Sequence, residues 1–106
     1  MSKISDFLNR YDFRVIRLGS AVPIPKLSGP GIVVIACEME PEQNEVLYRA
    51  IDGGEANDPV VVAMSMLKQP SIRAKCDGYL VAWVAEIPQV EERKSAMREL
   101  MNILRI

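Results

Sequence analysis

The chemistry open to this chain is limited first by a missing residue type, because the chain contains no histidine. That absence excludes Ser-His-Asp and Cys-His arrangements and histidine-based metal sites. Any general base must therefore be an Asp, Glu, Lys or Tyr side chain. Tyr48 next to Arg49 could bind an anion, but we expect a surface pair that packs across neighbouring strands. The residues alone supply no complete catalytic constellation, which favours a binding module over an enzyme.

Two cysteines, Cys37 and Cys76, are the other candidates for reactive chemistry. Each lies in or beside an apolar segment, so we expect small buried side chains, with a disulfide or a reactive thiol as the alternatives. They form no Cys-x-x-Cys motif, and the chain holds no further cysteine for a zinc site. The N-terminal segment carries Asp6, Asn9 and Arg10, unlike a signal peptide. We therefore expect a cytoplasmic protein.

Acidic side chains concentrate in the middle of the chain, although the formal net charge is only −1. From residue 38 to residue 58 the single base is Arg49, and the acids are Glu38, Glu40, Glu42, Glu45, Asp52, Glu55 and Asp58. We expect two acidic loops, 38–45 and 52–58, to dock on another protein with a basic surface. Solvated loops, or an imitation of nucleic-acid charge, are the alternatives. A phosphate backbone would be repelled there, so nucleic acid is the less favoured partner.

The elements that must position these side chains follow from the hydrophobic pattern. The 106 residues are 49% hydrophobic and 25% charged, which is typical of one globular domain over 1–106. No apolar run approaches a membrane span, so no membrane is expected as a partner. The pattern predicts helices at 2–11, 58–67 and 89–105, strands at 13–18, 32–37, 45–51 and 79–87, and a loop at 19–31.

Local signals set the boundaries of the central elements. Asp58 and Pro59 form a helix cap pair, which we weigh above the β-branched run 60–62 that favours a strand. Pro41 predicts a connecting turn at 38–44.

Other signals end strands or place them in the sheet. The glycine pair 53–54 predicts the end of the return strand, and Pro70 predicts the end of the helix before it. Strand 79–87 is apolar at both parities, so we expect a central strand with Trp83 in the core. The order of elements predicts an α+β fold, a small mixed or antiparallel sheet of three to four strands with helices packed on it.

From the hairpin onward the sequence resembles the GIY-YIG nuclease superfamily. In that family a Gly-Ile-Tyr strand is followed by a Tyr-Ile-Gly strand. Here PGIVVI at 30–35 stands in the first place and VLYRA at 46–50 in the second. The family then has a helix, a third strand and a helix with an Arg-x-x-x-Glu-x-x-Leu-type pattern, where this chain has residues 83–104. The resemblance implies a GIY-YIG-like core over 29–106, preceded by a helix, strand and loop in 1–28.

Most of the family's functional positions hold other residue types in this chain. The first-strand tyrosine, the arginine and the metal-binding glutamate fall at Val33, Asp58 and Met97. A phosphodiester hydrolase needs a carboxylate to hold Mg²⁺ and a cation to stabilise the developing charge. The resemblance therefore implies a catalytically inactive member. The alternative is a divergent Mg²⁺-dependent endonuclease, whose catalytic residues would be Tyr48, Arg93 and Glu99.

The function that we expect is non-enzymatic binding of another protein, without a cofactor. A small protein with an acidic end could be a regulator or an inhibitor, for instance one encoded by a phage or a mobile element. Self-association through an edge strand such as 13–18 would instead make it a homo-oligomer.

Overall fold

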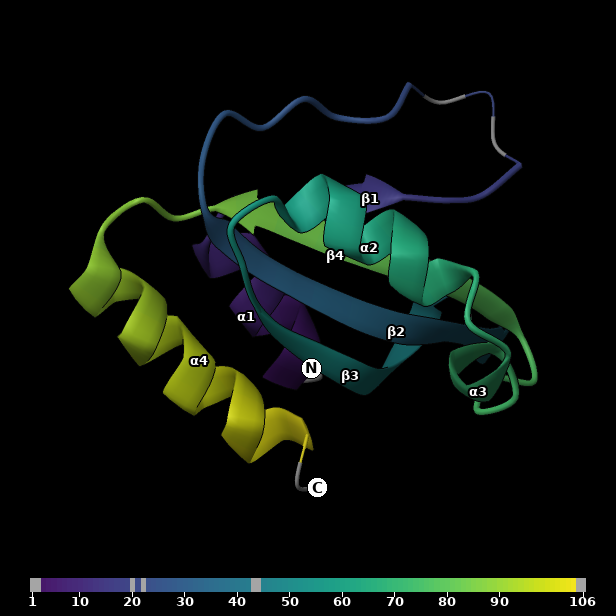
Figure 1. Ribbon diagram of the computed structural model, residues 1–106. Coiled ribbons are helices and arrows are strands. Elements are labelled where there is room, and N and C mark those ends of the chain that lie inside the picture. The colour runs from purple at the N-terminus through teal and green to yellow at the C-terminus, as the bar shows by residue number, and fades with distance from the viewer. Residues whose placement is uncertain (1–2, 20, 22, 43–44, 105–106) are drawn as a thin grey trace.

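Four antiparallel strands in the order β1-β4-β2-β3 form one sheet with helices on both faces (Figure 1). The computed structural model describes residues 3–19, 21, 23–42 and 45–104. The strands are β1 Arg14–Ile16, β2 Gly31–Glu42, β3 Glu45–Ala56 and β4 Tyr79–Glu86. The helices are α1 Lys3–Arg10, α2 Pro59–Leu67, α3 Pro70–Arg73 and α4 Val90–Leu104. This architecture confirms the predicted α+β fold, and the sheet is antiparallel throughout. Among the described helices, none is long and apolar enough to cross a membrane.

The two interior strands are buried on both faces, as their continuous apolar runs indicate. Ile32 and Val34 of β2 pack into a cluster with α1 and α4, whereas Val33 and Ile35 pack into a second cluster with α2 and α3. The alternation follows from the two-residue period of a strand. The sheet therefore forms the middle layer between two pairs of helices (Figure 1).

Helix α2 begins where the cap pair predicts. The Asp58 side chain accepts a hydrogen bond from the Val61 N–H at 3.3 Å, and Pro59 occupies the first turn. The cap outweighs the β-branched run because the helix also buries Ala63 and Leu67 against the sheet. Pro70 does not merely end the segment, since it begins the short helix α3.

The prediction that the glycine pair 53–54 ends a strand is wrong, because β3 continues to Ala56. A Cβ atom on Gly53 would lie 2.7 Å from the Val33 carbonyl oxygen and 2.8 Å from a methyl of Leu100 in α4. The missing side chain thus lets α4 approach the sheet, which a local pattern cannot indicate.

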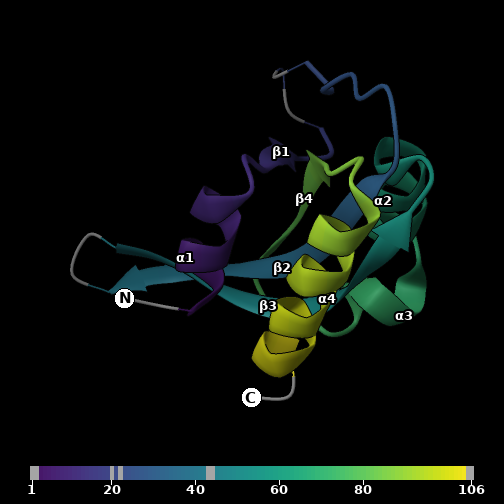
Figure 2. The ribbon, with the colours of Figure 1, turned by 90° about the vertical axis from the view of Figure 1, so that its left-hand side faces the viewer.

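The hairpin is longer than the sequence predicts, because 38–42 is strand and not a turn. The register of β2 against β3 shifts between Met39 and Glu42, an irregularity that accommodates Pro41 within the strand. Gln43 and Asn44 lie outside the described residues. Strand β4 pairs with β2 only as far as Glu38, so the rest of the hairpin leaves the sheet. We name 39–42 and 45–47 the arm, which projects beyond α1 in Figure 2.

The long loop before β2 is tied to the far end of β4. The Ser28 N–H and hydroxyl donate to the Glu86 carboxylate at 2.6 and 2.9 Å. These hydrogen bonds lower the pKa of Glu86, and the bond from the backbone N–H has the larger effect. Because the folded-state pKa lies below that of the unfolded chain, the contact stabilises the fold above the unfolded-state pKa. This contribution is lost as the pH falls through the folded-state pKa.

Replacing Ser28 with alanine is expected to raise the pKa of Glu86 toward its ordinary value, because the hydroxyl donor is removed. An NMR titration of the Glu86 carboxyl carbon measures this shift. Ser65→Ala, on the exposed side of α2, is the matched control and should leave that pKa unchanged. An unaltered Glu86 pKa in Ser28→Ala would contradict the assignment.

Candidate functional site at the root of the arm

The three catalytic residues of the nuclease alternative, Tyr48, Arg93 and Glu99, each contact a different part of the fold. Tyr48 packs edge-on against the ring of Trp83, with centroids 5.7 Å apart. Arg93 donates to the carbonyls of Ile87 and Pro88 at 2.9 Å each, so it fastens the turn before α4. Glu99 forms an ion pair with a residue of α1, Arg10. Within the described residues, no hydrogen bond or ion pair joins any two of the three.

The two tyrosine positions of the resemblance do not share a face of the sheet. Val33 packs into the cluster with α2, whereas Tyr48 packs against the cluster with α1 and α4. Met97 also packs against the cluster with α1 and α4, as a partly buried hydrophobic side chain. Trp83 also packs there, as predicted, although its buried indole N–H has no hydrogen-bond partner among the described residues.

The segments predicted as acidic loops, 38–45 and 52–58, belong largely to the long strands β2 and β3. Asp52 accepts a hydrogen bond from the Gly53 N–H at 2.8 Å, and Glu55 forms an ion pair with Arg93 at 3.1 Å. Asp58 is the cap of α2. These three acids therefore have local partners at the end of β3 that lies far from the arm.

The acids near the arm divide into one that is paired and three that are not described. Glu38, at the last pairing of β2 with β4, forms an ion pair with Arg17. Glu40, Glu42 and Glu45 lie on the strands of the arm, and their side chains are outside the described residues. We name the row where β4 pairing ends, around Glu38, the root of the arm.

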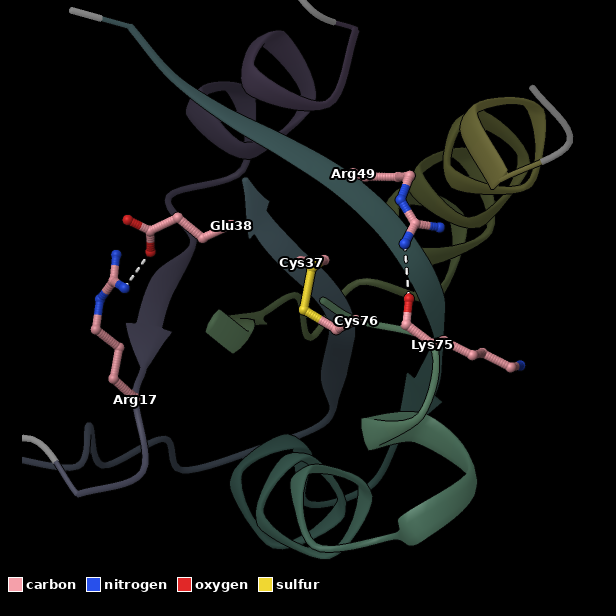
Figure 3. The surroundings of a disulfide bond; sticks show 6 residues. All are labelled: Arg17, Cys37, Glu38, Arg49, Lys75 and Cys76. Carbon is pink, nitrogen blue, oxygen red and sulfur yellow. Dashed lines mark hydrogen bonds and ion pairs between the residues drawn. A yellow bond between two sulfur atoms is a disulfide. The ribbon is translucent and has the colours of Figure 1, made fainter. Parts of the chain in front are cut away.

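One face of the root is held by a cation that reaches across the sheet. Arg17 follows β1, and β4 lies between β1 and β2, so the side chain spans β4 to pair with Glu38. Figure 3 shows this ion pair. A second guanidinium nitrogen of Arg17 donates to the Tyr48 hydroxyl at 3.5 Å. The hydrogen bond to Glu38, more than any other contact, raises the pKa of Arg17, which therefore stays charged.

The other face of the root carries a disulfide between Cys37 and Cys76, with Cα atoms 5.4 Å apart (Figure 3). The expectation of two separate buried thiols is therefore wrong. The fold brings together residues 39 positions apart, and no local signal reports that pairing. Beside the bond, an Arg49 guanidinium nitrogen donates to the Lys75 carbonyl oxygen at 2.6 Å, so Arg49 has this partner in place of an anion.

The segment that carries Cys76 also lies directly on β2. A Cβ atom on Gly78 would stand 2.3 Å from the Glu38 carbonyl oxygen, a separation that only glycine permits. The root is thus held by side chains on both faces and by a backbone contact. The sequence signals were a cysteine in the first strand of the hairpin and another just before the strand predicted at 79–87, yet neither indicated the pairing.

Comparison of the chain with protein-family models, with curated proteins and with solved structures finds no match in any of the three.

Proposed function

We propose that this protein is a non-enzymatic binding module that docks its arm on a basic surface of another protein. The observation that carries the proposal is the arm itself, whose strands continue beyond the end of β4 pairing at Glu38. A two-stranded ribbon is marginal by itself in water. In this protein the contacts on both faces of the root stabilise such a ribbon, which supports a functional role for the arm.

The open strand edges of the arm suit contact with a partner. Beyond Glu38, β2 has β3 on one side and no described strand on the other. Strand β3 is the last in the sheet, so its outer edge is open over the described residues. Unpaired strand edges accept backbone hydrogen bonds from other chains.

The charge of the arm favours a basic partner. Residues 38–45 hold four acids and no base, and among the described side chains Arg17 is paired with Glu38. The remaining acids, Glu40, Glu42 and Glu45, would attract Lys and Arg side chains and speed association. They would repel a phosphate backbone. A regulator or inhibitor that masks a basic surface of its target fits this charge.

The contacts of the candidate catalytic residues support a role without catalysis. Tyr48, Arg93 and Glu99 each hold parts of the fold together, and the positions Val33 and Tyr48 face opposite sides of the sheet. We propose a degenerate GIY-YIG-like domain, on the strength of the quoted residues and of an element order that runs hairpin, two helices, strand and helix.

The compartment stays a prediction, and the disulfide argues against a steadily reducing cytoplasm. Structural disulfides persist in oxidising compartments, whereas cytosolic ones are mostly transient or redox-sensing. We propose that the oxidised root is the binding-competent form.

Reversing the charge of the arm is expected to weaken partner binding at least tenfold. The variant is Glu40→Lys with Glu42→Lys and Glu45→Lys. The partner is captured on immobilised wild-type protein, purified and titrated by calorimetry at two salt concentrations. The control, Asp6→Lys with Glu91→Lys and Glu92→Lys, makes the same change in net charge on α1 and α4. The melting temperature should change little, because exposed charges contribute little to stability.

Two results would contradict the proposal. One is an equal loss of affinity in the arm variant and in its control, which would reflect net charge alone. The other is cleavage of DNA or RNA by the purified protein with Mg²⁺ or Mn²⁺, provided that Tyr48→Phe or Glu99→Gln abolishes it. That second result would establish the endonuclease alternative.

A further inference from the structure

A cavity of about 290 Å³ lies beside the disulfide, on the side of the sheet that α2 and α3 cover. Its walls come from four segments: the residues after β1, the ends of α2 and α3, and the start of β4. The lining side chains that matter for its chemistry are Leu18, Leu67, Leu80, Arg73, Cys76 and Tyr79. The disulfide and the Arg49 contact to the Lys75 carbonyl hold the wall next to Cys76 in place.

One part of the cavity is apolar and the other is cationic. Leu67 is fully buried in the core, and Leu80 packs against the same cluster, so these side chains form a fixed apolar wall. Arg73 ends α3 at the surface, where its backbone is hydrogen-bonded to Gln69 and Cys76. Its guanidinium has no hydrogen bond or ion pair with any described residue. A guanidinium in that position is available to an anion from outside the chain.

Bases outnumber acids in the segment that contributes Arg73 and Cys76 to the cavity wall. Residues 68–76 contain three bases, Lys68, Arg73 and Lys75, and no acid. The nearest acid is Asp77, which lies between the lining residues Cys76 and Gly78, and Glu38 behind the disulfide is already paired with Arg17. The cavity therefore favours an anionic group at its mouth.

The size of the cavity limits what can enter it. Ligand pockets commonly measure about 300–1,000 Å³, so this one is at the small end. At about 30 Å³ for each water-sized group, the volume holds roughly ten non-hydrogen atoms. A nucleotide is too large for this volume, whereas a short-chain carboxylic acid fits it and pairs with the arginine and the leucines of the lining.

We propose that this cavity binds a small carboxylate with an apolar tail. The carboxylate meets Arg73, and the tail lies against Leu18, Leu67 and Leu80. Binding here does not depend on the arm, so the site stands or falls separately from the proposed docking function. Because Cys76 is part of the wall, the oxidised protein is the form that binds.

Octanoate, with ten non-hydrogen atoms, is the probe for this site. An NMR titration of the oxidised protein should show saturable shifts at the amides of Leu18, Leu67 and Leu80. Octanol has the same chain without the charge and should bind at least tenfold more weakly. Arg73→Gln should reduce the octanoate affinity at least tenfold, and Lys68→Gln, a nearby base outside the lining, should change it less than twofold.

The proposal is overturned by any of three results. The first is that millimolar octanoate causes no chemical-shift change at these amides, which would show that the cavity does not bind it. The second is that octanol binds with the same affinity as octanoate, which would show that the carboxylate does not contribute. The third is that Arg73→Gln and Lys68→Gln lower the octanoate affinity equally, which would show a nonspecific attraction to positive charge. Spectra of both variants that match the wild type away from the cavity establish that each is folded.

Discussion

Replacing Cys37 and Cys76 together with alanine is expected to lower the free energy of unfolding by about 4 kcal/mol. The bond closes a loop between residues 39 positions apart, and a crosslink of that span removes much conformational entropy from the unfolded chain. A domain of this size is stable by about 5–15 kcal/mol, so the loss is a large fraction of the total. The oxidised bond is thus a major part of what holds the root of the arm.

Urea denaturation with and without a reductant measures this effect. The wild-type protein should fall to the stability of the double variant once the disulfide is reduced, and the double variant should not respond to the reductant. Hydrogen exchange should accelerate first in 75–78, which the bond holds on β2. A wild type whose unfolding midpoint ignores the reductant would refute a stabilising role for the bond.

Replacing Gly31 with alanine is expected to cost about 3 kcal/mol or more, at the upper end of overpacking effects. The new Cβ atom would lie 1.8 Å from the Ala85 carbonyl oxygen and 3.0 Å from the Glu86 Cα. Both are backbone atoms of β4, which is an interior strand beside β2. Neither strand can withdraw without breaking the ladder in which Gly31 opposes Glu86.

Thermal unfolding provides the measurement, with an expected drop in melting temperature of about 10–20 °C. Gly29→Ala is the matched control, because a Cβ atom there has no neighbour within 4 Å. That variant should change the stability by less than about 1 kcal/mol and can raise it, since alanine restricts the unfolded chain. Equal melting temperatures for the two variants would show that β2 and β4 are not packed as closely as described.

The sequence by itself determined the elements whose signals are local. The cap pair Asp58-Pro59 placed the start of α2, and the apolar period of 89–105 placed α4 within a residue at each end. The doubly apolar run at 79–87 identified β4 as an interior strand. Helix hydrogen bonds and caps join residues a few positions apart, so a window of sequence contains both partners.

The candidate site was decided by tertiary structure, because its partners are distant in the chain. Arg17 meets Glu38 only after β4 is inserted between β1 and β2, and Cys76 meets Cys37 only after α3 turns back onto the sheet. The glycine pair 53–54 and Pro41 both predicted a hairpin that is too short, since cross-strand pairing overrides the local preference of glycine and proline. The chain's missing histidine thus limited its chemistry from the start, whereas the positions of its cysteines, acids and arginines became informative only in the folded molecule.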